Sequence, residues 1–200
     1  MDTHQRIIDA MIELLRRQGY AATGIKELAH LAGAPTGSIY HHFRGGKREV
    51  ASQALSQAGD AYLELLMDIA GEYEDPISGV EGAFGEAAKV IEQTGWVNIC
   101  PVSTVLGEVA DAEPEIREIG DQIYRTWIDA GAAHYERQGL APADAREFTY
   151  ALIAGLEGAL ILARTQRSTE PLHAAGRNLA TSLRGLLAVV QSSRAVHSDI

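Results

Sequence analysis

The side chains best suited to hydrogen bonding with a ligand are gathered between residues 36 and 42. They follow a short segment of helical apolar spacing, residues 25–32, and a Gly33-Ala34-Pro35 turn. Two short helices joined by a tight turn with a glycine form the helix-turn-helix pattern, in which the second helix enters the DNA major groove and the first braces it. Hydroxyl, phenol and imidazole groups on such a helix can bond to base edges and phosphate oxygens. The candidates are Thr36, Ser38, Tyr40, His41 and His42.

The position of each candidate within this helix predicts its role. Residues at the start of the helix reach base edges, and here these are Thr36, Gly37 and Ser38, of which Gly37 permits close approach to the duplex. The ring-bearing residues that follow are predicted to bind phosphates: Tyr40, His41 and His42. Two alternatives stay open. Thr36 and Ser38 could serve only as helix caps. One of the three ring-bearing residues could belong to the core, where Phe43 is also expected.

Two lysines extend the predicted phosphate contacts. Lys47 begins the next helix, where its charge adds to the partial positive charge and free amides of the helix N-terminus. Lys26 lies in the bracing helix and is a second candidate, with simple solvation as the alternative. We therefore predict a DNA-binding surface built from residues 26–47.

Catalytic and metal-binding patterns are missing from the sequence. No His-Glu-x-x-His motif occurs, and Cys100, the single cysteine, has no charged neighbour within three positions to lower its pKa. The series Gly79-x-x-Gly82-x-x-Gly85 has no strand before it and is not the dinucleotide fingerprint. We predict a protein that is not an enzyme and has neither a metal site nor a cofactor.

The net charge of −10 is distributed unevenly along the 200 residues. Residues 1–50 hold seven Lys or Arg and five Asp or Glu, a balance of +2, whereas residues 51–200 hold ten and twenty-two, a balance of −12. Affinity for DNA comes largely from cations that meet phosphates. A mildly basic head on an acidic body suits a DNA-binding protein whose body is repelled from the duplex, although chance clustering would explain the charge alone.

Apolar spacing predicts helices throughout and no strands. Gly19 is expected to end the first helix, residues 72–78 with Pro76 are expected to form a loop, and later helices are expected at 80–94, 102–109, 115–138, 143–167 and 172–191. The fold class is all-α, with a three-helix helix-turn-helix head and a six-helix body. The predicted domains are 1–46 for DNA binding, 47–191 for ligand binding and dimerisation, and a frayed tail at 192–200.

Several segments together resemble the TetR family of transcriptional regulators. In the head these are Gly19-Tyr20, residues 23–32, Ile39-Tyr40-His41-His42-Phe43 and Lys47. Residues 33–38, Gly45-Gly46-Lys47, Cys100-Pro101 and residues 157–164 resemble its multidrug- and flavonoid-responsive (LmrA/YxaF-like) subgroup. The resemblance implies a homodimeric repressor that binds operator DNA through two heads and a small ligand through its bodies.

The aromatic residues of the body are the candidates for a ligand pocket, which needs an apolar wall with a few polar groups. Trp127 and Tyr124 share one helical segment, Cys100 lies near a bend between helices, and Trp96 precedes that bend. Aromatic residues on long helices are more often core, which is the alternative. Because no cluster of Lys or Arg lies mid-chain, the sequence favours a small apolar ligand.

The last two helices are expected to pair the subunits. Small residues on the first permit close approach, and leucines supply an apolar face, with packing inside the monomer as the alternative. The predicted dimerisation residues are Ala151, Gly155, Gly158, Leu162, Leu183 and Leu186.

A helical scaffold or adaptor without DNA binding is the second class of function considered. It would explain the acidic body but not the helix-turn-helix residues, and salt-sensitive binding to DNA distinguishes the two classes. The N-terminus is polar and no apolar run approaches the roughly 20 residues needed to span a bilayer. We therefore expect a cytoplasmic protein without a membrane partner.

Overall fold

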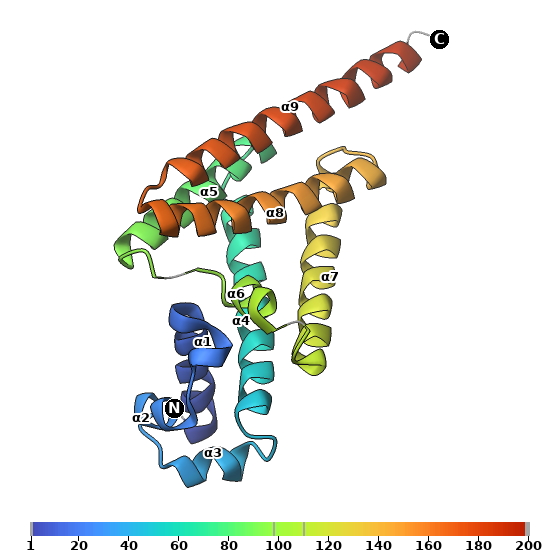
Figure 1. The fold of residues 1–200 in the computed structure, drawn as a ribbon. Coiled ribbons are helices and arrows are strands. Elements are labelled where there is room, and N and C mark those ends of the chain that lie inside the picture. The colour runs from blue at the N-terminus through green and yellow to red at the C-terminus, as the bar shows by residue number, and fades with distance from the viewer. Residues whose placement is uncertain (1, 98, 110, 199–200) are drawn as a thin grey trace. The chain divides into compact units, whose positions relative to one another are not determined.

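The computed structural model describes residues 2–97, 99–109 and 111–198, and these residues form nine α-helices and no strand (Figure 1). The all-α prediction is confirmed. Contacts divide the chain into two compact units, one of Met1–Leu63 with Val97–Tyr124 and the other of Glu64–Trp96 with Arg125–Ile200. Two long helices, α4 (Lys47–Gly71) and α7 (Pro114–Arg137), run from one unit into the other.

The first unit is built around α1 (Thr3–Ala22). Its apolar residues recur at helical spacing and form one buried face. The short helices α2 (Ile25–Leu31) and α3 (Thr36–His42) pack against this face and each other, and α6 (Pro101–Val109) packs along α1. Fully buried side chains from several of these helices share one core: Ile7, Met11, Leu15, Leu28, Ile39, Phe43 and Val105.

The second unit is formed mainly by α5 (Pro76–Gln93), α8 (Pro142–Gln166) and α9 (Glu170–Ser198). Both α5 and α8 pack against α9, and Figure 1 shows α8 and α9 side by side. A Cβ atom added at Gly176 of α9 would lie 2.9 Å from Cβ of Phe84 in α5, so the glycine permits this close approach. Phe84, Ile91 and Leu172 are fully buried in this unit.

Proline begins four of the helices in the described residues: α5, α6, α7 and α8. The ring fixes φ near the helical value, and the missing N–H would have no partner in the first turn. At α5, the Asp75 carboxylate also accepts hydrogen bonds from the amides of Ile77 (3.0 Å) and Ser78 (2.9 Å). The loop expected at 72–78 is therefore wrong for its last three residues, where Asp75-Pro76 is a helix start.

One helix end agrees with the sequence prediction and one differs. Gly19 breaks the regular helix as expected, with φ 78° and ψ −175°, and a further helical stretch then continues to Ala22. The helical assignment of α9 extends to Ser198, because residues 192–198 contain neither proline nor glycine to break it. Residues 199–200 of the predicted frayed tail lie outside the described residues. The functional boundary at residue 46 stays a prediction, since the compact units divide the chain elsewhere.

Helix α8 is the one helix in the described ranges that is long and apolar enough to cross a membrane, judged by length and composition alone. Only a third of its apolar window is buried inside the monomer. The helix nevertheless packs against α9, and Phe148 and Leu160 on its inner side belong to the core. A core helix with one exposed apolar face meets the same criteria.

Candidate functional site

The helix-turn-helix forms where the sequence predicted it. Gly33 adopts φ 59°, and its amide donates to the carbonyl of His30 at 3.1 Å, which ends α2. The Ala34 amide donates to the carbonyl of Ala29 at 3.0 Å, and Pro35 then begins the turn into α3 with extended backbone. Local hydrogen bonds therefore set the angle between the two short helices.

The outer face of α3 carries most of the predicted DNA contacts. Thr36, Gly37 and His41 are exposed, and Tyr40 has 53% of its surface exposed. Ser38 is half-buried. The N-cap residue of α3 is Pro35, so Thr36 is the first helical residue rather than the cap. A Cβ atom added at Gly37 meets no atom within 4 Å, so this position is open to a large partner.

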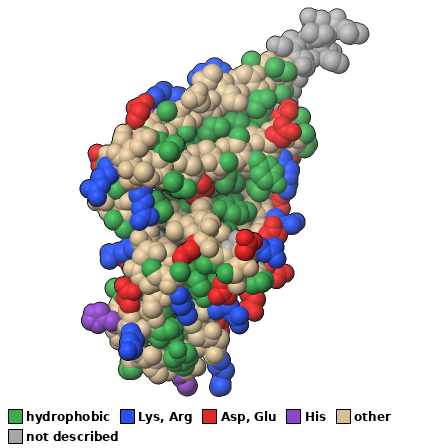
Figure 2. Space-filling view, in the orientation of Figure 1, with side chains coloured by type: hydrophobic (Ala, Val, Ile, Leu, Met, Phe, Trp, Pro, Cys, Tyr) green, Lys and Arg blue, Asp and Glu red, His purple; other side chains and the backbone are tan. Residues whose placement is uncertain are grey.

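The histidines of α3 occupy two different environments. His42 is half-buried, with its ring centroid 6.0 Å from that of His4, whereas His41 lies on the exposed side. The His4 ring stacks on Phe43 at 4.6 Å, and Phe43 is fully buried as expected. Figure 2 shows Lys, Arg and His side chains on the part of the first unit that holds α2 and α3. His42 therefore lies nearest to the core among the three ring-bearing candidates.

Lys47 begins α4 as predicted, but its ammonium is not simply solvated. Nζ lies 4.1 Å from the centroid of the Tyr20 ring. Burial lowers the pKa of the Lys47 ammonium, and the carboxylates of Glu108 and Glu113 oppose this shift. Lys26, in contrast, is exposed on α2. The sequence pattern predicts Lys47 but not its neighbours Tyr20, Glu108 and Glu113. The two acidic residues are more than sixty positions away from Lys47 in the chain.

The predicted ligand residues are divided between the two units. Cys100 and Tyr124 belong to the first unit, and Trp96 and Trp127 belong to the second. Cys100 and Trp127 are both buried. The hydroxyls of Tyr124 and Ser103 lie 2.8 Å apart, which places a polar group that the sequence analysis missed beside a predicted one. Within the second unit Trp96 has φ 68°, a backbone conformation that is rare for bulky side chains.

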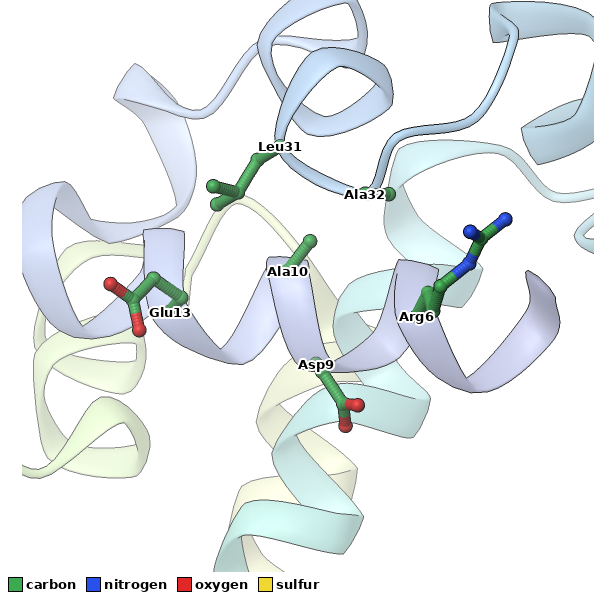
Figure 3. Close-up of a pocket in the computed structure, with 6 residues that line it drawn as sticks. All are labelled: Arg6, Asp9, Ala10, Glu13, Leu31 and Ala32. Carbon is green, nitrogen blue, oxygen red and sulfur yellow. The ribbon is translucent and has the colours of Figure 1, made fainter. Parts of the chain in front are cut away.

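Two surface grooves lie in the first unit, and none of the predicted ligand residues lines either. One, of about 280 Å³, lies between α1 and α2 (Figure 3). Leu31, Ala10 and Ala32 form its apolar part, and its charged lining residues are Arg6, Asp9 and Glu13. The other, of about 430 Å³, is lined mainly by polar residues of α4. Both are open surface grooves, so neither is the enclosed pocket expected beside Trp127 and Cys100.

The predicted dimerisation residues fall into exposed and buried sets. On α8, Ala151 and Gly158 are exposed and Leu162 has 52% of its surface exposed. Gly155 is half-buried, and a Cβ atom there would lie 3.0 Å from Cδ1 of Leu179 in α9. On α9, Leu186 is half-buried. Leu183 has no exposed surface and packs in the core of the monomer, which is the alternative to the dimerisation role predicted for it.

Two family models match the chain. Residues 7–54 match the bacterial regulatory proteins of the tetR family, and residues 76–178 match the C-terminal domain of LmrA/YxaF-like transcriptional regulators. The chain therefore belongs to the TetR family of bacterial transcriptional regulators, in the LmrA/YxaF-like branch. It is a DNA-binding regulator rather than a helical scaffold or an enzyme. Regulators of this family bind operator DNA and small ligands and act as dimers.

Individual relatives and solved structures agree with this assignment. The chain is 26% identical to the HTH-type transcriptional regulator LmrA of Bacillus subtilis, over 86% of this chain and 91% of the relative. A regulatory protein TetR from Rhodobacter sphaeroides superposes with a TM-score of 0.79 at 26% identity, covering 90% of this chain and 97% of that one. A TetR regulator from Legionella pneumophila, 18% identical, shares the fold with a TM-score of 0.80 over 91% and 97%.

Proposed function

We propose that this regulator is a repressor that leaves its operator when a small apolar molecule binds to its body. The observation that carries the DNA-binding part of the proposal is the exposed outer face of α3, with open space above Gly37. Such a helix can lie in the major groove. Because the operator lies on the bacterial chromosome, the proposed site of action is the cytoplasm.

The proposed DNA surface divides its work between base edges and phosphates. Thr36, Gly37 and Ser38 lie at the start of α3, where side chains and backbone approach the bases. The phosphate contacts come from the residues that flank these three. They fix the position of the protein along the duplex but do not distinguish one base sequence from another. They are proposed for Lys26, Tyr40, His41, His42 and Lys47. The functional head then ends near residue 46, and the remaining helices hold the ligand and the partner subunit.

The proposed dimer is formed by the outer face of α8 together with α9. The exposed apolar side chains there are Ile161, Leu162 and Val189. Apolar surface of this kind is stabilised when a second copy covers it. A two-fold dimer would place two heads on successive major-groove faces, about 34–36 Å apart.

The ligand contacts are proposed for the candidates that the sequence named. These are Cys100 and Tyr124, which belong to the first unit, and Trp127 and Trp96, which belong to the second. A ligand releases DNA only if it binds more tightly to the dimer whose heads are wrongly spaced for the operator. The coupling is reciprocal, so operator DNA weakens ligand binding by the same factor.

Footprinting on the DNA upstream of the protein's own gene tests the proposed function. We expect protection of two half-sites one helical turn apart, lost when salt is raised or when an active compound from an apolar library is added. In vitro transcription from the same DNA should fall on addition of the protein and recover with the compound. Failure to bind any DNA in a salt-sensitive manner would contradict the proposal, and increased transcription would identify an activator.

Replacing Lys47 with alanine should weaken DNA binding to all sequences by a similar factor. Phosphate contacts carry no base identity, so specificity is retained while one counterion-releasing charge is lost. The slope of log K against log salt should become shallower by about one. Fluorescence anisotropy over a salt series measures both quantities. An unchanged affinity and slope would show that Lys47 does not contact the DNA backbone.

Replacing Trp127 with phenylalanine should remove most of the fluorescence change that a releasing compound produces. Trp127 is buried and is the tryptophan expected at the wall of the pocket. Trp96 is the second tryptophan of the chain and also contributes to the fluorescence. Titration of the wild type, Trp127→Phe and Trp96→Phe with the same compound separates the two. If the compound binds tightly but leaves operator affinity unchanged, its site is not the regulatory one.

A further inference from the structure

The carboxylate of Glu108 joins α6 to the end of α1 through two backbone hydrogen bonds. The amide of Tyr20 donates to Oε2 at 2.8 Å, and the amide of Ala21 donates to Oε1 at 2.8 Å. Gly19, with φ 78° and ψ −175°, turns the backbone out of the helix just before these two amides. A Cβ atom at Gly19 would lie 2.5 Å from Oε2 of Glu108, so glycine is also needed to admit the carboxylate.

Tyr20 connects this carboxylate to the start of α4. Its side chain is buried, its hydroxyl donates to Oε1 of Glu113 at 3.4 Å, and its ring lies under the Lys47 ammonium at 4.1 Å. Burial, together with the neighbouring Glu113 carboxylate, raises the pKa of the Tyr20 phenol, so the phenol keeps its proton. The four side chains all belong to the first unit.

We propose that Glu108 is a positioning residue for DNA binding, which holds Tyr20 in place and through it orients Lys47 for a phosphate. This inference rests on the proposed function of Lys47. A side chain that is already held in its bound conformation loses less conformational freedom when the DNA binds. Glu108 itself does not meet the DNA, and as an anion it repels phosphates.

Whether DNA affinity rises or falls when Glu108 is replaced therefore distinguishes a positioning role from simple charge repulsion. Removing an acidic residue beside a DNA-binding head strengthens binding when only charge matters, because repulsion by the phosphates is reduced. If positioning dominates, the same change weakens binding. Aspartate at this position keeps the charge but is one methylene shorter, so it cannot reach both amides.

The test compares Glu108→Asp and Glu108→Gln with the wild type on a DNA duplex that the wild-type protein has selected from a random pool. We expect both variants to bind roughly three- to tenfold more weakly, with melting temperatures lowered by only a few degrees because two hydrogen bonds of an exposed carboxylate are weakened while the core is untouched. The matched controls are Glu118→Asp and Glu118→Gln on the exposed surface of α7, which should bind as tightly as the wild type or slightly more tightly.

Two further measurements distinguish positioning from a general loss of structure. In the wild type, Lys47→Ala should reduce the salt slope by about one, whereas in the Glu108→Asp background the same change should reduce it by much less. Amide hydrogen exchange should accelerate at Tyr20 and Ala21 while the core amides of α1 keep their protection.

Each outcome decides the inference. The inference is supported if the Glu108 variants bind DNA more weakly and if Lys47→Ala no longer changes the salt slope in the Glu108→Asp background. Binding equal to or tighter than that of the wild type in both Glu108 variants overturns it, as does weaker binding with the full Lys47 contribution retained. If the wild-type protein selects no DNA from the pool, the proposed function fails instead, independently of Glu108.

Discussion

Replacing Gly37 with leucine should weaken operator binding by about 10- to 100-fold, equivalent to losing about one good base contact. Gly37 lies in the second position of α3, and a Cβ atom added there meets nothing in the protein within 4 Å. The new side chain would therefore occupy space that the DNA needs and would not disturb the core. Anisotropy with the selected DNA and with a scrambled duplex measures the loss.

The same substitution should leave the head at least as stable as in the wild type. Leucine is a better helix former than glycine by about 0.5–1 kcal/mol in an exposed helix. Gly71→Leu in the last turn of α4 is the matched control, since that position is also exposed and open within 4 Å. The control should keep full DNA affinity. If Gly37→Leu also binds normally, the outer face of α3 does not approach the bases.

Replacing Gly158 with leucine should convert the dimer largely to monomer and weaken operator binding by about 100-fold or more. Overpacking a close helix contact costs about 1–3 kcal/mol, and losing the second head removes the avidity of the pair. Within the monomer a Cβ atom at Gly158 meets no atom within 4 Å, so the helical content should be kept. Sedimentation velocity and circular dichroism measure the two effects.

Gly107 provides a control for the dimer prediction, and Gly155 shows the effect of overpacking within one subunit. Gly107→Leu on α6 places the same side chain in open space outside the proposed surface and should leave the dimer intact. Gly155→Leu should lower the melting temperature, because its Cβ atom would lie 3.0 Å from Leu179 in α9 of the same subunit. A wild-type protein that sediments as a monomer at micromolar concentration would contradict the proposed dimer itself.

The sequence by itself determined the helix-turn-helix because its signals are local. Apolar spacing over 25–32, the positive φ at Gly33 and the fixed φ of Pro35 all act within a few residues, and the structure has both helices at these places. Local signals were also misread where two interpretations compete. Pro76 was interpreted as part of a loop, although Asp75 before it makes the pair a helix start.

Periodicity also identified apolar faces without identifying what covers them. Leu162 and Leu183 both have the spacing of a buried face, yet one is about half exposed on α8 and the other is enclosed in the core of the monomer. The difference arises from the packing of α9 against α8 and against α5, which is far from α9 in the sequence. No pattern within α9 alone carries that information.

The end of α1 shows most clearly what only the tertiary structure decided. The sequence predicted that Gly19 ends a helix, and the turn at this residue follows from glycine's freedom at positive φ. It did not predict that the amides beyond the turn bond to Glu108, or that the Lys47 ammonium rests on the Tyr20 ring. These partners are 27 to 88 residues apart in the chain. Only the packing of α6 along α1 brings the donors and the acceptor within hydrogen-bonding distance.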